Sequence, residues 1–327
     1  MTVAYYGFVL AALSLQLLMG ANDGGTLLGS IVATNIIRPA WAILLLFVSI
    51  VVAPLVIGTA VVTTLGNRIV PLSSIRMEML YGTVAATVLW VWLAQRLRSP
   101  VSISYTFVGA LVGSALAADL SGSLHRQYVI QILGGMILAI LAGFVLGYVL
   151  VKVVNVVGSR ATPRANRLFK LLQVFSSVGL VLGYGANDAA KTLSLLYMAS
   201  VVLGRVSRQA TIAHTTLLGI VFIVGTLFLG GGFAQTSGFR LMKSSPKTVF
   251  LAQGVTAALT LVFARLGIPV SSTESLNMAL VGTGAGERPG CVRWNVVTHL
   301  VLGWVVTIPA SIGLSWAITA ALLRLFR

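Results

Sequence analysis

Two acidic side chains occupy identical local sequences that lie far apart in an apolar chain. The tetrapeptide Gly-Ala-Asn-Asp occurs at residues 20–23 and again at residues 185–188, and its aspartates are two of only six acidic residues. A carboxylate at membrane depth is costly, so it usually has a function. Amide and carboxylate oxygens are hard ligands that suit a small cation, and a carboxylate can also carry a proton. The predicted ligands of a sodium ion or a proton are Asn22, Asp23, Asn187 and Asp188.

Other roles for these motifs stay open. Asn22 and Asp23 could instead cap a helix. Lys191 lies three residues after Asp188, on the same face if the segment is helical. It would then either neutralise Asp188 or contact an anionic substrate. Asn22, Asn187 and Lys191 are therefore also candidate substrate ligands.

A second pair of matching segments is rich in hydroxyl groups. Pro-Val-Ser-Ile-Ser occupies residues 100–104, and Pro-Val-Ser-Ser-Thr occupies residues 269–273. Proline favours the first turn of a helix, serine and threonine cap helix starts, and a helix N-terminus attracts anions. Two such starts would hold a tetrahedral oxyanion from opposite sides, although each could be an ordinary helix start after a loop. The predicted anion ligands are Ser102, Ser104, Ser271, Ser272 and Thr273.

The two pairs of motifs indicate an internal duplication. They recur in the same order at offsets of 165 and 169 residues. Such repeats are typical of secondary transporters, and an inverted repeat would let one fixed site open alternately to both sides. We expect a first membrane repeat at 1–155, a basic cytoplasmic linker at 156–170 and a second membrane repeat at 171–327.

The composition is that of a membrane protein. Of the 327 residues, 57% are hydrophobic and 9% are charged, whereas soluble domains average about 25% charged residues. Apolar runs lie at 3–19, 40–65, 79–93, 129–154, 172–183, 212–229, 249–263 and 296–323. Several reach the ~20 residues that span a bilayer, and shorter ones fit broken or re-entrant half-helices. We predict an all-α, multi-pass protein of the cytoplasmic membrane with about ten to twelve membrane segments.

The net charge of +16 fits cytoplasmic loops of a membrane protein better than a nucleic-acid surface. Residues 152–170 carry five basic residues and no acid. One cysteine excludes an internal disulfide, and the three histidines share no metal-ligand spacing. Because no phosphate-binding loop for nucleotides is present, we expect neither an enzyme nor a cofactor, but a transporter driven by a gradient or by a separate subunit.

The paired motifs resemble those of the inorganic phosphate transporter family, the PiT-type symporters. That family carries GANDVAN-like and G-x-NDAQK-like signatures, which match residues 20–26 and 185–191 here. The resemblance extends over nearly the whole chain, to residues 169–177, 267–273, 292–294 and 307–310. It implies a symporter of inorganic phosphate coupled to Na⁺ or H⁺, with an inverted repeat and commonly a dimer, embedded in the lipid bilayer.

The chain departs from the family pattern close to the predicted site. Tyr105 and Glu274 stand where the family usually has histidine after the Ser/Thr run. These changes keep a sulfate permease of the same fold, or a membrane receptor or assembly factor without transport, as alternatives. A carboxylate beside an oxyanion favours its protonated form, so Glu274 is a candidate proton site. It could instead pair with an arginine or face a loop.

Overall fold

The apolar runs of the sequence form long helices. The computed structural model describes residues 2–96, 101–158, 165–205, 211–230 and 245–325. Its long helices are α1 Thr2–Met19, α3 Pro39–Val56, α5 Met77–Arg96, α7 Arg126–Val157, α8 Ala165–Asn187, α10 Ile212–Leu229, α12 Pro246–Arg265 and α14 Trp294–Leu325. In the described part of the chain, eight spans are long and apolar enough to cross a membrane. No strand occurs among these residues, which confirms the all-α prediction.

Short elements interrupt or follow the long helices. They are the π-turn η1 Gly20–Gly24, α2 Gly25–Val32, α4 Ala60–Thr63, the π-turn η2 Thr64–Arg68, the 3₁₀ turn η3 Leu72–Ser74, α6 Ile103–Ala117, α9 Ala189–Val202, α13 Ser272–Glu287 and the 3₁₀ turn η5 Pro289–Cys291. The apolar run at 40–65 is not one segment. It breaks after α3, where Gly58 has a φ of 112°, a backbone conformation that favours glycine.

Two short helices, α6 and α13, fit the predicted half-helices, but not at the predicted places: the shorter apolar runs 79–93, 172–183 and 249–263 belong to the full-length helices α5, α8 and α12. Helices α6 and α13 have 15 and 16 residues, so each is about 22–24 Å long and too short to cross a hydrocarbon core of about 30 Å. Both are buried over nearly their whole length. With the eight long spans they bring the described segments to the lower end of the predicted range.

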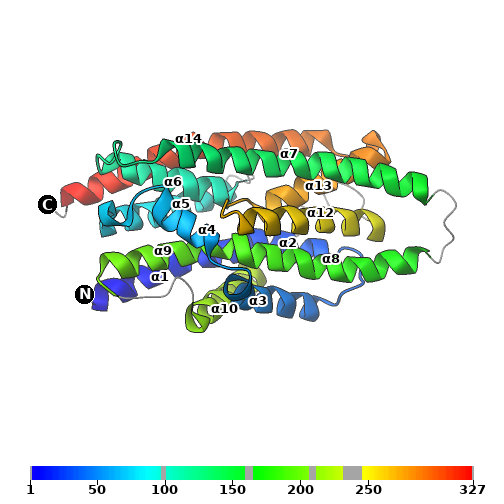
Figure 1. The fold of residues 1–327 in the computed structure, drawn as a ribbon, viewed down its shortest axis with the longest axis horizontal. Coiled ribbons are helices and arrows are strands. Elements are labelled where there is room, and N and C mark those ends of the chain that lie inside the picture. Colours follow the sequence, from blue (N-terminus) through cyan, green and yellow to red (C-terminus); the bar gives the residue numbers. More distant parts are fainter. Residues whose placement is uncertain (1, 97–100, 159–164, 206–210, 231–244, 326–327) are drawn as a thin grey trace.

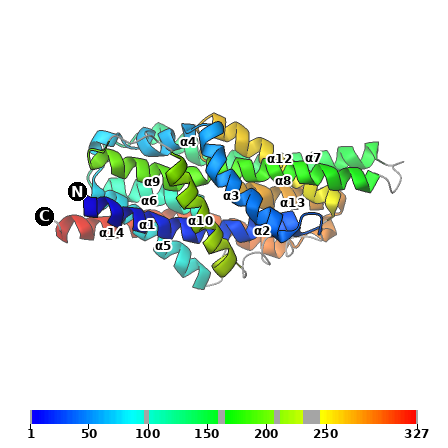
Figure 2. The same cartoon turned by 90° about the horizontal axis from the view of Figure 1, so that it is seen from below.

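The helices of the two halves pack in matching pairs. Helix α6 lies against α5 and α14, and α13 lies correspondingly against α12 and α7. In the same way α1 contacts α10, and α8 contacts α3. Figures 1 and 2 show the resulting elongated bundle, in which α3 and α10 cross on one side. Each half therefore contributes a short buried helix that is supported by the last long helix of the other half.

The glycine of each Gly-Ala-Asn-Asp motif allows a crossing helix to come close. A Cβ on Gly20 would overlap the backbone of Phe222 in α10, and a Cβ on Gly185 would overlap the backbone of Ser49 in α3. The close approach also lets Thr226 of α10 donate a hydrogen bond to the carbonyl oxygen of Gly20 at 3.0 Å. Small residues at helix crossings are a general feature of membrane interiors.

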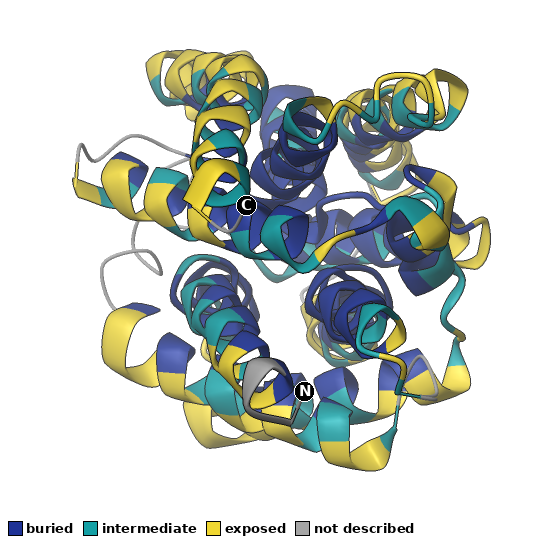
Figure 3. Cartoon of the chain, turned by 90° about the vertical axis from the view of Figure 1, so that its left-hand side faces the viewer, coloured by how far each residue is buried: buried dark blue, intermediate teal, exposed yellow. Residues whose placement is uncertain are grey.

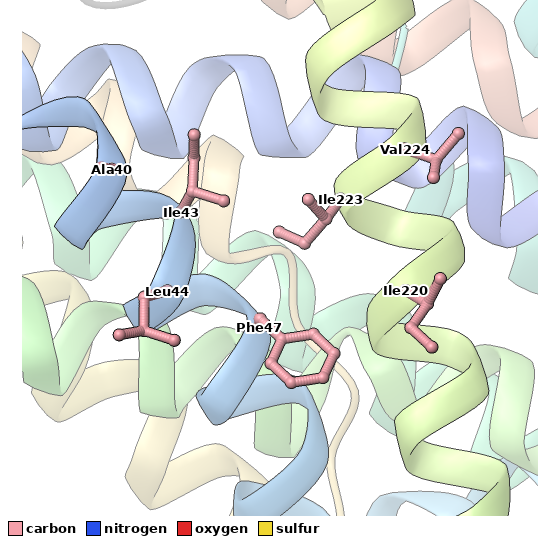
Figure 4. A pocket seen from close by; sticks show the side chains of 7 residues that line it. All are labelled: Ala40, Ile43, Leu44, Phe47, Ile220, Ile223 and Val224. Carbon is pink, nitrogen blue, oxygen red and sulfur yellow. The ribbon is translucent and has the colours of Figure 1, made fainter.

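The outer surface is apolar, as expected for helices that face lipid. Figure 3 shows buried helices at the centre of the bundle and exposed faces around it. An apolar groove of about 350 Å³ opens between α3 and α10 on this outer side (Figure 4). Its lining residues are Ala40, Ile43, Leu44, Phe47, Ile220, Ile223 and Val224. None of these side chains can bind an oxyanion or a cation, so the groove is not the predicted site.

The two ends of the bundle carry different parts of the chain. Both chain termini lie at one end, and the C-terminal end of α7 and the start of α8 lie at the other (Figure 1). Of the predicted basic linker at 156–170, residues 159–164 lie outside the described residues. So do Pro100 and most of two further basic segments of the sequence, residues 205–208 and 240–247. The repeat boundaries and the inversion of the repeats stay predictions.

Candidate functional site

The first Gly-Ala-Asn-Asp motif forms the π-turn between α1 and α2. π-turns inside helices frequently mark functional sites. The turn holds Asp23 in the interior at 4% exposure. Its Oδ1 accepts hydrogen bonds from Asn22 Nδ2 at 2.9 Å and from Thr273 Oγ1 at 3.3 Å. Its Oδ2 accepts one from the hydroxyl of Tyr184 at 3.3 Å.

The second motif forms the break between α8 and α9. Asp188 is buried, and its Oδ1 pairs with the ammonium group of Lys191. Its Oδ2 accepts hydrogen bonds from the backbone amide of Ser272 at 3.2 Å and from the Ser272 hydroxyl. Asp188 occupies the N-cap position of α9, yet its side chain makes no capping hydrogen bond. The side chain of Asp188 therefore does not cap α9, and Lys191 neutralises this aspartate. The helix-cap alternative for Asn22 and Asp23 is wrong, because the caps of η1 and α2 are Met19 and Gly24.

Asn187 connects the second motif to the segment before α13. Its Oδ1 accepts a hydrogen bond from the amide of Val270 at 2.8 Å, and its Nδ2 donates to the carbonyl oxygen of Ile268 at 3.3 Å. This side chain is fully buried. In this structure Asn187 therefore positions the α13 start, and its role as a ligand stays a prediction.

Both Ser/Thr-rich segments are helix starts, as predicted. Ser102 caps α6 by accepting a hydrogen bond from the Tyr105 amide at 3.1 Å, and Ser271 caps α13 by accepting one from the Glu274 amide at 3.4 Å. Ser104 is buried in the first turn of α6. Pro269 lies two residues before the cap instead of in the first turn, because α13 begins at Ser272.

The structure brings the predicted side chains into one buried region. Thr273 at the start of α13 contacts Asp23 of the first motif, and its neighbour Ser272 contacts Asp188 of the second. Lys191 and Asp188 both act electrostatically on Asp23. Glu274 lies close to Ser102, so the starts of α6 and α13 face one another. The region combines three carboxyl groups, one lysine and two helix N-termini, which are groups that can bind a cation and an oxyanion together.

Glu274 fits neither alternative to a proton site, which were an ion pair with an arginine and a position facing a loop. It is 3% exposed, so it does not face a loop. No arginine pairs with it in the described part of the chain, where neither of its carboxyl oxygens has a hydrogen-bond partner. Its role as a proton site stays a prediction.

Comparison with known proteins identifies the family. A family model described as "Phosphate transporter family" matches residues 19–315, which is most of the chain. The chain belongs to the phosphate transporter family. A "Probable low-affinity inorganic phosphate transporter" of Rhizobium meliloti (strain 1021) is 30% identical over 309 residues, covering 93% of this chain and 92% of the relative. A protein of the same description from Bacillus subtilis (strain 168) is 25% identical, and the match covers 93% of this chain and 92% of that protein.

A solved structure shares the fold of this phosphate transporter family member. It is described as "The sodium-dependent phosphate transporter", and it covers 100% of both chains with a TM-score of 0.86 at 19% identity. The family and the eight candidate spans confirm a multi-pass membrane protein of the transporter class. The inverted repeat and the dimer stay predictions.

Tyr184 is a site residue that the sequence did not reveal. Its side chain is fully buried and donates to Asp23 from the helix that precedes the second motif. The available signal was its place directly before Gly185, where the first half has Met19 before Gly20. Thr192 and Gln16 were also missed, and their hydrogen bond of 2.8 Å ties α9 to α1 next to the site.

Proposed function

We propose that this protein is a secondary active transporter that carries inorganic phosphate across the cytoplasmic membrane together with Na⁺ or H⁺. The proposal rests on the family and on the buried site in which both repeated motifs meet one Ser/Thr-rich helix start. A cation bound beside the anion lowers the electrostatic cost of holding that anion at membrane depth. Coupling then follows, because each ion binds better when the other is present.

The observation that supports the proposal most directly is that only one of the two buried aspartates has a cationic partner. Asp188 has Lys191 as an ion-pair partner, whereas no lysine or arginine of the described residues forms an ion pair with Asp23. The partners of Asp23 are the neutral donors of Asn22, Tyr184 and Thr273. A buried carboxylate with neutral partners only is suited to bind a mobile cation. We therefore place the coupling ion at Asp23, with Asp188 as the second candidate ligand.

The starts of α6 and α13 supply the anion side of the proposed site. Free amides at a helix N-terminus and hydroxyls of Ser or Thr are donors that suit a tetrahedral oxyanion. The hydroxyls available there belong to Ser102, Ser104, Ser271, Ser272 and Thr273. Because Thr273 also contacts Asp23, binding of the anion and of the cation share a side chain.

Uptake of labelled phosphate into proteoliposomes, under an imposed sodium or proton gradient, tests this function. Asp23→Asn removes the charge but keeps the size of the side chain, so gradient-driven uptake is expected to fall to the level of empty vesicles. Asp119→Asn is the matched control, because the same change is made at an exposed residue outside the site. Normal coupled uptake by the Asp23 variant would contradict the assignment.

The same assay separates the alternatives. Labelled sulfate taken up in preference to phosphate would indicate a sulfate permease. Binding of phosphate without any flux, under either gradient, would indicate a receptor with this fold.

A further inference from the structure

The first turn of α13 carries an acidic side chain that does not complete a capping box. Ser271 and Glu274 stand three residues apart, in the positions of the two members of a capping box, and Ser271 Oγ does accept the Glu274 amide. In a complete capping box the glutamate would accept the amide of the cap residue in return. Both carboxyl oxygens of Glu274 instead lack a partner among the described residues, at 3% exposure.

The surroundings of Glu274 do not satisfy its carboxyl group either. Four charged or titratable groups from other elements act on it, namely Asp23, Asp188, Lys191 and Tyr105. Lys191 is the cation among them, and it already pairs with Asp188. The Ser102 hydroxyl lies near enough to stabilise the carboxylate, although the two groups do not meet hydrogen-bond geometry in this structure. A buried polar group without a partner costs about 1–3 kcal/mol, and more when charged, so its presence requires an explanation.

Glu274 also stands where an anion is expected. The starts of α6 and α13 face one another at this point, and helix N-termini attract oxyanions. A carboxylate at the same point would repel a dianion at short range. The helix N-termini can attract the anion despite the repulsion by Glu274 if one proton lies between the carboxyl group and the anion. Monohydrogen phosphate brings that proton as its own P–OH group, whereas the sulfate dianion has no proton to give.

We propose that Glu274 is a specificity-determining residue that accepts a hydrogen bond from the P–OH group of phosphate and thereby excludes sulfate. This inference rests on the proposed phosphate transport and names the group that distinguishes phosphate from its closest competitor. The oxygens of the sulfate dianion and of the Glu274 carboxylate can only accept hydrogen bonds. Bound side by side, neither group would supply a donor to the other. Sites that hydrogen-bond a hydroxyl of the substrate reject analogues that lack it far more strongly than apolar pockets reject analogues of similar shape.

Competition against labelled phosphate uptake at mildly alkaline pH tests the inference, because phosphate, arsenate and sulfate are then all mainly dianions. Arsenate carries a hydroxyl and sulfate does not. In the parent protein, arsenate is expected to compete and sulfate is not.

Glu274→Gln keeps the size of the side chain, removes the charge and adds donors. The ratio of sulfate to phosphate affinity is expected to rise by roughly 10- to 100-fold, the range for one hydrogen bond to a charged group.

Two further variants and the parent protein make the outcome decisive. Glu287→Gln is the control, because Glu287 ends the same helix and pairs with Lys247 away from the site, so the ratio should not change. Glu274→Asp keeps an acceptor and should keep sulfate excluded. Equal competition by sulfate and arsenate in the parent would overturn the inference without any variant, as would an unchanged ratio in Glu274→Gln. Both results leave phosphate transport intact, whereas a parent that takes up no phosphate would refute the proposed function itself.

Discussion

At the scale of single residues, the buried charges of Asp188 and Lys191 depend on each other. Both side chains are 1% exposed, and Asp188 is further bound by Ser272. Removing one partner of a buried ion pair leaves the other charge uncompensated, while replacing both partners by neutral groups is often nearly neutral. The loss of one partner should therefore lower the free energy of unfolding much more than the replacement of both.

Lys191→Met should test this dependence. It leaves Asp188 unpaired and is expected to destabilise the protein by about 3–5 kcal/mol. The double variant Lys191→Met with Asp188→Asn should recover most of that loss, because no buried charge then remains. Thermal unfolding of the purified protein in detergent measures each variant, with Asp188→Asn as the fourth corner of the cycle. Additive losses in the double variant would show that the two charges are not coupled.

The residue types at the site could be found from the sequence where they are repeated. Asp23, Asp188 and the Ser/Thr-rich segments stand out because charge and hydroxyl groups recur in an apolar chain. Tyr184 could not be found in this way, because its contact with Asp23 joins residues 161 positions apart. Only the packing of α8 beside the π-turn determines which hydroxyl reaches that carboxylate.

At the scale of helices, the site depends on two crossings that only glycine permits. The α10 backbone passes against Gly20, and the α3 backbone passes against Gly185. A close crossing places the π-turn and the α8–α9 break in the interior, with their polar side chains turned away from lipid. The same small residue therefore serves packing and function at each motif.

Gly20→Ala and Gly185→Ala are expected to destabilise the protein by about 1–3 kcal/mol or more, the usual cost of overpacking, because the added methyl group meets backbone atoms. Gly254→Ala is the control. Its added Cβ would meet no atom within 4 Å, and alanine is the better helix former by about 1 kcal/mol. Detergent unfolding and phosphate uptake measure both effects. If all three variants behave alike, close packing at the motifs is not limiting.

Helix existence was predictable at this scale, but the points where helices break were not. Long apolar runs predicted α7, α10 and α14 nearly to their ends. The π-turn at Gly20–Gly24 and the break at Gly58 depend on tertiary contacts and on backbone conformation that hydropathy does not encode. The position of Pro269 before the cap of α13 depends on Asn187, which holds the preceding backbone.

At the scale of the whole molecule, an ion pair and a hydrogen bond connect three helices at one end of the bundle. Lys247 at the start of α12 pairs with Glu287 at the end of α13 and donates to Asn155 near the end of α7 at 2.7 Å. These links place the following turn, with Cys291, at the end of the bundle where α7 ends and the basic segment 152–170 begins. The other end also carries arginines, such as Arg126, Arg205 and Arg324, but its connecting segments each have fewer basic residues than the five of 152–170. From the positive-inside rule we therefore expect the Cys291 end to face the cytoplasm.

Cys291 is a natural probe of this orientation, because it is exposed and is the single cysteine of the chain. A membrane-impermeant maleimide is expected to label it in inside-out vesicles and not in intact cells. For the control, Ser121→Cys in a Cys291→Ser background puts the thiol before the start of α7, about 48 Å from its far end by helix length. That variant should be labelled in intact cells. The opposite pattern for both thiols would invert the protein in the membrane and show that the basic segment at 152–170 does not set its orientation.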